Sequence, residues 1–316
     1  MAENLLDKKP TRDPAQLFGG KRFDIEHALN MYATNFVLMP AFGIYEEKIV
    51  AAFKPHLAKC HIYVIGTMPA IETVDQRLEE GRLVIGILVA GKRHELAWPM
   101  PDGVELVETE RGWFIKNGDG YSAPSEEEMA RRLNGEQDAI GFDVLYIGQA
   151  YGKDGSRNAL DRLLKHETLQ RISVKGVPSD RRLTLLMLEI EPGNRMITIM
   201  NPWAENKKDG SARISAGLDK LFGTSDAERV TLYEASLIRY FQPPFNKEFK
   251  ESFPSTNLKV LADCYDKDFS ALISEICIDE LPFKMTSDAV QPSQYHTAKF
   301  DLHEDKARQV FFGKKT

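Results

Sequence analysis

The sharpest change of hydrophobic pattern along the chain lies within residues 142–172. An apolar, β-prone run, FDVLYI, ends at Gly148 and predicts a strand. The turn-rich letters GKDGS follow, and from Asn158 onward leucines recur at the spacing of a helix. Arg162 and His166 are four residues apart, so a helix presents them together, opposite its leucine stripe. The pattern therefore predicts a strand, a loop and a helix that displays an Arg-His pair.

A second helical pattern begins near Val230 and stops before two prolines, which cannot continue a helix. Glu234 lies among the apolar residues of this helix, on the side that faces the core. An ionised carboxylate in that position is costly unless it is paired or bound to a cation. Glu234 is therefore a candidate metal ligand, and pairing with Arg229 or Arg239 is the alternative.

These two stretches together resemble the GIY-YIG endonuclease superfamily. That family has a strand ending in Tyr-Ile/Val-Gly, a helix with Arg-x3-His, a third strand, and a helix with Glu-x2-Leu-Ile followed by a proline and an asparagine. The matching positions, in the same order, are Tyr146–Gly148, Arg162, His166, a strand at Leu183–Ile190, Glu234, Leu237–Ile238 and Asn246. The resemblance covers residues 140–250, about a third of the chain.

The resemblance implies an α+β fold, in which a small antiparallel sheet is flanked by helices. It also implies metal-dependent hydrolysis of DNA phosphodiester bonds, in restriction, repair or defence against foreign DNA. The expected cofactor is Mg²⁺ or Mn²⁺, because such a hard dication keeps most of its waters and needs few protein carboxylates. Glu234 is the expected metal ligand.

The resemblance also gives roles to the other matched residues. Tyr146 is expected to position or deprotonate the attacking water, and Arg162 to clamp the phosphate through its fork of donors. His166 is expected to assist as an acid-base group or to hold the phosphate, and Asn246 to shape the site by hydrogen bonding. Taken singly, each of these residues has an ordinary alternative as a strand aromatic, a surface pair or a turn residue.

The first tyrosine of the family pattern has no assigned position in this sequence. In the family, a Gly-Ile-Tyr strand comes shortly before the Tyr-Ile-Gly strand. The literal Gly43–Tyr45 lies about a hundred residues before Tyr146, so we discount it, and we discount the Tyr63–Gly66 run likewise. The nearest strand-like candidate upstream is Trp113–Ile115, with Tyr121 in the turn beyond it. Without this tyrosine, the alternative is a catalytically degenerate module that binds nucleic acid or assembles with proteins.

The charge pattern limits the kind of nucleic-acid contact. A formal charge of −6 argues against a protein that coats nucleic acid indiscriminately. Within residues 157–182, however, seven basic residues stand against three acidic ones, which favours a local DNA contact or a solvated helix face. Arg157, Lys165 and Arg171 are the candidate DNA contacts, and Gly148 would allow the DNA backbone to approach closely. Arg157 is also the alternative phosphate ligand, by its distance from the Tyr-Ile-Gly strand.

The remaining chain predicts two further parts beside the GIY-YIG-like domain at 136–250. Residues 1–135 alternate between helical and strand-like patterns, with helices expected at Phe23–Met31 and Val74–Glu80, and predict an N-terminal α/β accessory domain. A helix that Ser125 caps is expected to end at Asn134-Gly135, at the domain boundary. Residues 251–316 form a C-terminal extension. The sequence does not reveal the role of the N-terminal domain, and a third, weaker hypothesis is a regulatory protein in which this domain binds a small ligand or a partner protein.

The composition predicts a soluble, cytoplasmic protein with no membrane partner. Apolar residues make up 42% of the chain and charged residues 28%, and the apolar runs are too short to cross a bilayer. The first residues lack the apolar centre of a signal peptide. Cys60, Cys264 and Cys277 show neither metal-ligand nor disulfide spacing, which is typical of a reducing compartment.

Overall fold

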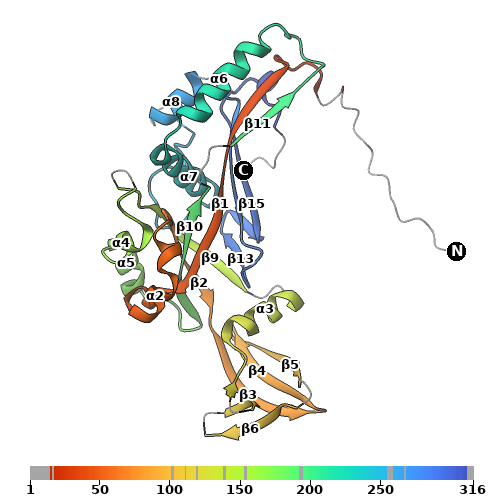
Figure 1. Ribbon diagram of the computed structural model, residues 1–316, viewed down its shortest axis with the longest axis vertical. Helices are drawn as coiled ribbons and strands as arrows, with labels where there is room; N and C mark the ends of the chain where they lie inside the picture. Colours follow the sequence, from red (N-terminus) through yellow and green to blue (C-terminus); the bar gives the residue numbers. More distant parts are fainter. Residues whose placement is uncertain are drawn as a thin grey trace, which may run out of the picture.

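One long strand, β1 (Ile25–Pro40), joins the two halves of the main sheet in the computed structural model (Figure 1). Its first half pairs with β11 and β12, and its second half with β10. The structure describes Ala15 and residues 18–311, except 101–102, 111, 119, 138–139, 153–154, 192–194, 255–258 and 267.

The main sheet contains nine strands within these described residues. Their order is β14-β13-β9-β2-β10-β1-β12-β15, and β11 also pairs with β1. The pairs β1–β12 and β9–β13 are parallel, and the other pairs are antiparallel. Besides β1, the strands are β2 (Ile62–Pro69), β9 (Gly141–Gln149), β10 (Arg181–Ile190), β11 (Arg195–Met200), β12 (Ala271–Cys277), β13 (Lys284–Ser287), β14 (Val290–Ser293) and β15 (Tyr295–Asp301).

This sheet corrects the predicted fold class. The sequence predicts a small antiparallel sheet flanked by helices, whereas the structure has a large mixed sheet. β1 and β2 come from the predicted N-terminal domain, β9 to β11 from the predicted GIY-YIG-like domain, and β12 to β15 from the predicted extension. The main sheet therefore extends across both predicted domain boundaries, at 135/136 and at 250/251. Local sequence patterns do not reveal this pairing, because β1 and β2 form hydrogen bonds with strands that lie far away in the sequence.

Two predicted helices in the first part of the chain are strands. Phe23–Met31 falls largely in β1, where every residue from Ile25 to Met31 is buried, so the strand lacks the polar alternation that identifies a one-sided strand. Val74–Glu80 falls in β3 (Ile71–Glu79), where a register shift between Thr73 and Asp75 interrupts the two-residue period. Both predictions are wrong because apolar residues can fall at helical spacing in a strand, when the strand is buried on both faces or is interrupted by a bulge.

Two small antiparallel sheets and one helix lie between β2 and β9 in sequence. The first sheet contains β3, β4 (Arg82–Val89) and β5 (Lys92–Pro99), and the second contains β6 (Glu105–Thr109), β7 (Gly112–Asn117) and β8 (Gly120–Ser122). They lie at one end of the molecule, away from α6 (Figure 1). α3 (Glu126–Gln137) follows, and Ser125 Oγ accepts a hydrogen bond from Glu128 N at 3.1 Å, as its capping role predicts. The helix continues through Asn134-Gly135, so its predicted end there is wrong.

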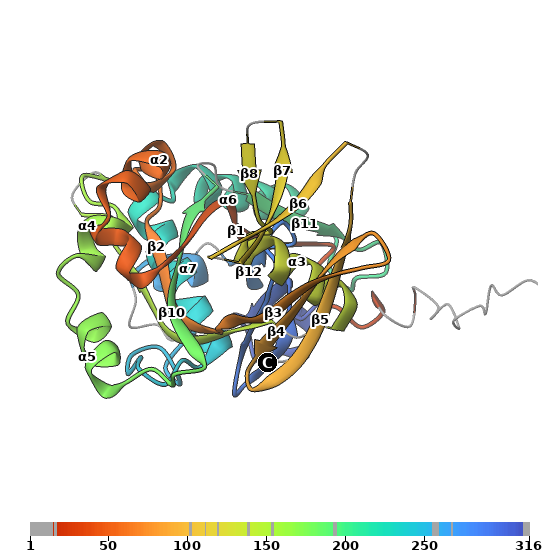
Figure 2. The ribbon, with the colours of Figure 1, turned by 90° about the horizontal axis from the view of Figure 1, so that it is seen from below.

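The helices cover both faces of the main sheet. Alternate residues of β2 enter two hydrophobic clusters: Tyr63 and Ile65 pack with α2, α4 and α5, and Ile62 and Val64 share a cluster with α7. Figure 2 shows α2, α4 and α5 gathered on one side of the molecule. The remaining helices are η1 (Ala41–Tyr45), α2 (Glu47–Leu57), α4 (Ala159–Leu163), α5 (Glu167–Lys175), α6 (Gly210–Gly223), α7 (Asp226–Phe241), α8 (Lys259–Asp266) and η2 (Lys306–Arg308). Within the described chain, no helix has the length and apolar character needed to span a membrane.

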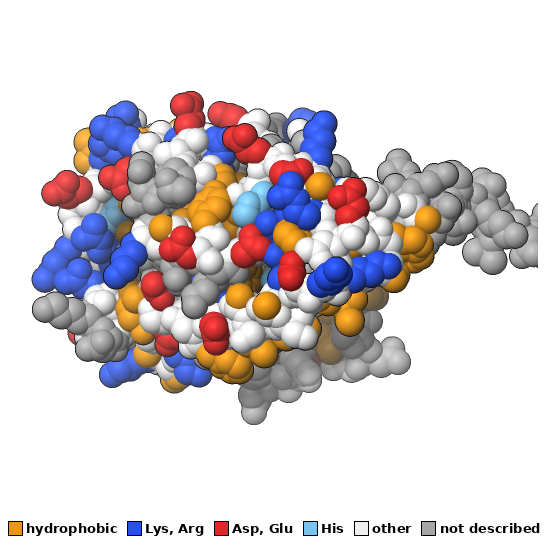
Figure 3. Space-filling model, turned by 90° about the horizontal axis from the view of Figure 1, so that it is seen from above, with side chains coloured by type: hydrophobic (Ala, Val, Ile, Leu, Met, Phe, Trp, Pro, Cys, Tyr) orange, Lys and Arg blue, Asp and Glu red, His pale blue; other side chains and the backbone are white. Residues whose placement is uncertain are grey.

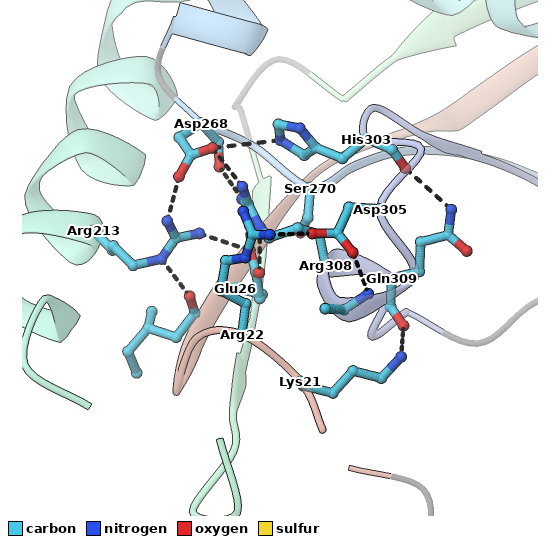
Figure 4. Close-up of polar contacts among 12 residues, drawn as sticks. Lys21, Arg22, Glu26, Arg213, Asp268, Ser270, His303, Asp305, Arg308 and Gln309 are labelled. Atoms are coloured by element: carbon cyan, nitrogen blue, oxygen red, sulfur yellow. Dashed lines mark hydrogen bonds and ion pairs between the residues drawn. The ribbon is translucent and has the colours of Figure 1, made fainter. Parts of the chain in front are cut away.

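A buried ion network fixes the C-terminal residues to the start of β1 (Figure 4). Glu26, only 1% exposed, accepts hydrogen bonds from Arg213 of α6 at 2.7 Å and from Arg308 of η2 at 2.6 Å. Asp268 pairs with both arginines as well, and both guanidinium groups lie over the ring of Phe23, at 4.0 and 4.9 Å. Two carboxylates thus neutralise two buried cations, which would otherwise be costly.

This network predicts that Glu26→Ala strongly destabilises the fold. The substitution leaves two buried guanidinium groups without one of their two shared carboxylates, and we expect a loss of about 3–5 kcal/mol in the free energy of unfolding. Urea denaturation monitored by circular dichroism measures the change. The matched control is Glu95→Ala in the solvent-exposed ion pair with Arg77, which should leave the midpoint nearly unchanged. Equal effects of the two substitutions would contradict the assignment.

Candidate active site

The second half of β9 lies at an open edge of the main sheet. Among the described residues, β13 pairs with β9 over Gly141–Asp143 only, and beyond this point β9 keeps its pairing with β2. The segment after α7 runs along this edge, and Phe245 N donates a hydrogen bond to Leu145 O at 3.1 Å. Residues from α7 and from the turn after it therefore reach the strand that carries Tyr146.

Asn246 replaces a neighbouring strand at this edge. Its Oδ1 accepts a hydrogen bond from Ile147 N at 2.9 Å, and its Nδ2 donates one to Ile147 O at 2.8 Å. The side chain is buried, so both bonds are shielded from water. Asn246 thus fixes the backbone between Tyr146 and Gly148. It acts on the site by positioning other residues.

β2 places Tyr63 beside the Tyr-Ile-Gly strand. In the antiparallel register Tyr63 is opposite Gly148, and Ile65 is opposite Tyr146. The rings of Tyr63 and Tyr146 are stacked, with centroids 6.2 Å apart and an angle of 27° between their planes. Tyr63 lies far from Tyr146 in the sequence, which is why we discounted it above. The residues between them form β3 to β8 and α3, and the strands on either side of this segment, β2 and β9, pair directly.

The other candidates for the first tyrosine lie elsewhere. Tyr45 ends the 3-10 helix η1, and its side chain is 61% exposed. Tyr121 lies in β8 of a separate sheet and is 59% exposed, and Trp113–Ile115 belongs to β7 of the same sheet. Tyr63 is therefore the tyrosine that the fold brings next to Tyr146.

The sequence predicts that His166 and Arg162 share one helix face, but in the structure they belong to two different helices. α4 ends at Leu163, and His166 is the N-cap of α5, where its Nδ1 accepts a hydrogen bond from Leu169 N at 3.2 Å. The break occurs because Asn158 and His166 each cap a short helix, which local spacing alone does not reveal. The Arg-His pair comes together through the turn between α4 and α5.

The cap determines which nitrogen of His166 carries the proton. Because Nδ1 accepts from Leu169, the neutral ring holds its proton on Nε2, which lies 2.9 Å from Tyr63 Oη. Nε2 therefore donates to the Tyr63 hydroxyl. Burial, with a further effect from the nearby Arg162, lowers the pKa of His166 to about 4, so the ring is neutral at physiological pH.

The ring of Tyr146 lies beside both Tyr63 and His166, with its centroid 5.1 Å from that of His166. Burial raises the pKa of Tyr146, the charge of Glu234 raises it further, and Arg162 and Tyr63 oppose both. Burial likewise raises the pKa of Tyr63 well above its usual range, and Arg162 opposes this. His166 Nε2 thus donates to the Tyr63 hydroxyl, and the Tyr146 ring packs against both groups at the open edge.

Arg162 is the cation of this site. Its side chain is exposed on the last turn of α4, and its positive charge shifts the pKa values of Tyr63, Tyr146, His166 and Glu234. The contacts shown directly are among three of these groups, because the ring centroids of Tyr63, Tyr146 and His166 lie within 6.2 Å of one another. Arg157, the alternative phosphate ligand, is an exposed loop residue that the structure connects through its backbone to Tyr151 and His61.

Glu234 occupies the half-buried position that its place on α7 predicts. Burial raises its pKa to about 8, hydrogen bonds from the side chain and backbone of Gln149 oppose this, and Glu248 raises it further. The two arginines that the sequence offers as partners have other contacts: Arg229 pairs with Asp226, and Arg239 donates to the carbonyl of Lys250. The charge of Arg162 also lowers the pKa of Glu234, but it offsets the effect of burial only in part.

The donor set fits a hydrated dication better than an enclosed metal centre. In the described part of the chain, no group of three or more His, Cys, Asp or Glu residues could hold a metal ion. Mg²⁺, by contrast, keeps several waters and binds through one or two carboxylates together with a substrate phosphate. Glu234, with Glu248 near enough to raise its pKa, offers this kind of site.

The predicted DNA contacts lie on the side of the molecule formed by α4 and α5. Lys165 is exposed, and Arg171 extends over the ring of Phe245 at 5.6 Å, beside Lys175 at 5.4 Å. Figure 3, viewed from above, shows Lys and Arg side chains at the left edge, the side on which α4 and α5 lie in Figure 1. Gly148 does not belong to this surface. It is buried, and the group that approaches it closely is the Tyr63 ring.

Sequence reasoning missed three residues of this site: Tyr63, Gln149 and Glu248. The strand-like run that begins at Tyr63 could have identified this residue as the first tyrosine. The contacts of Gln149 and Glu248, by contrast, depend on how α7 and the turn after it reach β9. When the chain was compared with known proteins, no family model, no curated protein and no solved structure matched it.

The contact between Tyr63 and Gly148 predicts that Gly148→Ala disturbs the site. A Cβ at Gly148 would lie 2.5 Å from the Tyr63 ring, which is packed between its neighbours and cannot easily move. We expect a loss of about 1–3 kcal/mol in unfolding free energy, measured by urea denaturation. The control is Gly135→Ala in α3, where an added Cβ meets no atom within 4 Å and should be neutral or stabilising. Equal stability of the two variants would contradict the packing.

The lowered pKa of His166 predicts an acid-dependent loss of stability. Between pH 6.5 and about 4 the unfolded chain binds a proton at this position and the folded chain does not, so stability falls as the pH decreases through this range. His166→Asn keeps a capping side chain but removes the titration. Urea denaturation at pH 7 and pH 4.5 should therefore show a smaller acid loss in the variant, by at most about 3 kcal/mol. The same loss in both proteins would contradict the burial of a neutral His166.

Proposed function

We propose that the chain is a metal-dependent endonuclease that hydrolyses DNA phosphodiester bonds at the open edge of β9. One observation carries this proposal: the rings of Tyr63, Tyr146 and His166, which come from three separate segments, pack within 6.2 Å of one another at one edge. Arg162 and Glu234 are close enough to shift the pKa of Tyr146 in opposite directions, which adds a cation and a carboxylate to this group. Such a combination of a cation, a buried carboxylate and neighbouring hydroxyl groups suits the transfer of a phosphoryl group to water better than it suits a purely structural role.

Hydrolysis of a phosphodiester requires an oriented water and compensation of the charge that develops on the phosphate. The exposed fork of Arg162 can bind the phosphate oxygens through two parallel hydrogen bonds. The Tyr146 side chain packs beside Tyr63 and His166, where its hydroxyl can orient the attacking water. His166 fixes the Tyr63 hydroxyl because its neutral ring donates to it. These residues thus orient the reactants before any bond changes.

Glu234 is the residue that would hold Mg²⁺ or Mn²⁺, with Glu248 close by. A bound dication favours the ionised carboxylate, which burial alone disfavours, and so it offsets the raised pKa of Glu234. When bound, the metal ion would supply neutralisation of phosphate charge and assistance to the leaving oxygen. Gln149 is close enough to lower the pKa of this carboxyl, and its Nε2 donates to Thr231 Oγ1 at 3.4 Å.

DNA is the proposed partner, and Arg157, Lys165 and Arg171 are its proposed contacts. Their exposed side chains lie on the same side of the molecule as Arg162, while the chain as a whole carries a formal charge of −6. Binding should therefore be local and sensitive to salt. The cysteines, of which Cys60 and Cys264 are buried and Cys277 is exposed, are free, which supports the cytoplasm as the proposed location.

The competing proposal is a catalytically degenerate module that binds nucleic acid or assembles with proteins. The acidic net charge favours it. Its main support in the sequence was the absence of a first tyrosine, and the position of Tyr63 beside Tyr146 removes that support. Cleavage and binding of DNA therefore have to be measured separately.

The nuclease proposal predicts nicking of supercoiled plasmid in the presence of Mg²⁺ or Mn²⁺ and none in EDTA. Glu234→Gln and Arg162→Ala should each lower the rate by about 10²-fold or more. Tyr63→Phe, which keeps the ring over Gly148 and removes the hydroxyl, should lower it by about 10²-fold as well. Arg131→Ala, at an exposed position of α3, is the matched control and should cut like the wild type.

Binding of a fluorescent DNA duplex, measured by anisotropy over a salt series, separates the two proposals. Glu234→Gln should still bind, because it keeps the basic surface. Equal nicking by the wild type and by the Glu234 and Arg162 variants would reveal a contaminating nuclease and defeat the proposal. Salt-sensitive binding with no cleavage under either metal would favour the degenerate module.

A further inference from the structure

Two cations of α5 lie over one aromatic ring. Arg171 Cζ is 5.6 Å and Lys175 Nζ is 5.4 Å from the centroid of the Phe245 ring. The two basic residues are four positions apart, so α5 presents them on one face, and both side chains are exposed. Like charges at this spacing destabilise a helix, and the ring face attracts both cations without neutralising either.

The nearby carboxylates do not neutralise this pair. Within the described residues, neither Arg171 nor Lys175 forms an ion pair with a carboxylate. Glu167 lies one turn before Arg171 on α5, but the arginine extends over the Phe245 ring instead. The turn after the ring carries two acidic and two basic residues, Lys247, Glu248, Lys250 and Glu251. The positive charge of the pair is therefore available to an external anion.

The Phe245 ring is fixed to the strand that carries Tyr146. Phe245 N donates a hydrogen bond to Leu145 O at 3.1 Å, and the side chain of the next residue, Asn246, bonds to both the N–H and the C=O of Ile147. The ring also packs, partly buried, against the same hydrophobic cluster as Tyr146. The two cations therefore have a defined position relative to the candidate active site.

α5 connects the cation pair to the site at its other end. Its N-cap, His166, packs against the rings of Tyr63 and Tyr146. Arg171 and Lys175 follow later in the helix, which places them about 8 and 14 Å from the N-cap along its axis. A DNA strand rises by about 3.4 Å per nucleotide. The pair therefore lies about two to four nucleotides from a phosphate bound beside Tyr146.

The chemistry of the pair fits a phosphate group. A guanidinium fork binds two phosphate oxygens at once, and an ammonium group adds a point charge with three donors. Exposed Arg162 and Lys165, which come before α5, extend the positive charge toward the site. A DNA strand held at the candidate site presents further phosphates at regular intervals, so one of them can reach the pair.

We propose that Arg171 and Lys175, held over Phe245, form a second phosphate subsite that binds one DNA phosphate about two to four nucleotides from the scissile one. The inference rests on the proposed function, because it takes DNA as the bound polymer. It adds Lys175 and the Phe245 ring to the DNA contacts. A strand that ends beside the scissile bond on this side lacks the contact, so the enzyme prefers cleavage within a strand to trimming of its end.

Anisotropy of a fluorescent DNA duplex in EDTA, measured over a salt series, tests the subsite without cleavage. The double substitution Arg171→Ala with Lys175→Ala should make the slope of log K against log salt less steep by about 1, because one phosphate contact is lost. The matched control, Lys92→Ala with Lys208→Ala, removes the same charge at two exposed positions elsewhere and should leave the slope unchanged. Equal slopes of the two double variants would overturn the subsite.

Substitution of the ring separates a built subsite from two unrelated surface cations. Phe245→Leu keeps both charges and an apolar contact with the cluster, but it removes the ring face. We expect its affinity for the duplex to fall about threefold, whereas Phe245→Tyr should bind like the wild type. Equal affinities of these two variants would show that the ring has no part in binding and would overturn the built subsite.

Duplexes with 5′-phosphate or 5′-hydroxyl ends distinguish the two sources of phosphate. The double variant Arg171→Ala with Lys175→Ala should lose the same affinity for both duplexes, because the subsite takes a phosphodiester within the strand. A loss confined to the phosphorylated ends would overturn this assignment and place a terminal phosphate in the subsite.

Inorganic phosphate tests the subsite independently of the nuclease proposal. In ¹⁵N NMR spectra of the full chain, added phosphate should shift the Nε–H signal of Arg171 in a saturable manner, and Phe245→Leu should weaken this binding. A wild type that nicks DNA but shows no such shift and no change of salt slope in the double variant would overturn the subsite alone. A wild type that binds no DNA would overturn the nuclease proposal, and a saturable shift would then still support the phosphate site.

Discussion

The candidate site depends on the antiparallel pairing of β2 with β9. This pairing sets Tyr63 over Gly148 and beside Tyr146, and the absence of a side chain at Gly148 makes the contact possible. The other groups are arranged around it: His166 caps α5 and orients the Tyr63 hydroxyl, while Asn246 holds the backbone of Ile147 in place of a further strand. A shift of one residue in this register would turn Tyr63 to the opposite face of the sheet. Its contacts with Tyr146 and His166 would then be lost.

Two kinds of buried polar group have different consequences in this molecule. The network of Glu26, Asp268, Arg213 and Arg308 is balanced in charge and well hydrogen bonded, so it fixes the C-terminal residues to β1 (Figure 4). Glu234 is half-buried without such compensation, and its pKa is raised to about 8. Unbalanced burial of this kind is typical of groups retained for chemistry. The contrast separates the stabilising network around Glu26 from the candidate site around Glu234.

The sequence predicted the parts of the site that lie close together along the chain. The Tyr146 strand, the capped helix at Ser125, the Glu234 helix and its end before the prolines all follow from local rules that the structure obeys. The fold class was wrong because long-range pairing decides it, and local periodicity carries no information about which strands meet. The same limit hid Tyr63, since an insertion of two sheets and a helix separates it from its partner strand. The Arg162–His166 geometry failed for a different reason, because two caps break one helix into two.

The length of the segment between Tyr63 and Asn246 has a consequence for synthesis of the protein on the ribosome. These residues lie about 180 positions apart, and the strand edge is complete only after the later one has emerged and docked on Ile147. Closing such a long loop is slow compared with local helix formation. A nascent chain that ends before Asn246 therefore cannot complete this edge, so the groups of the candidate site come together only after Asn246 has left the exit tunnel.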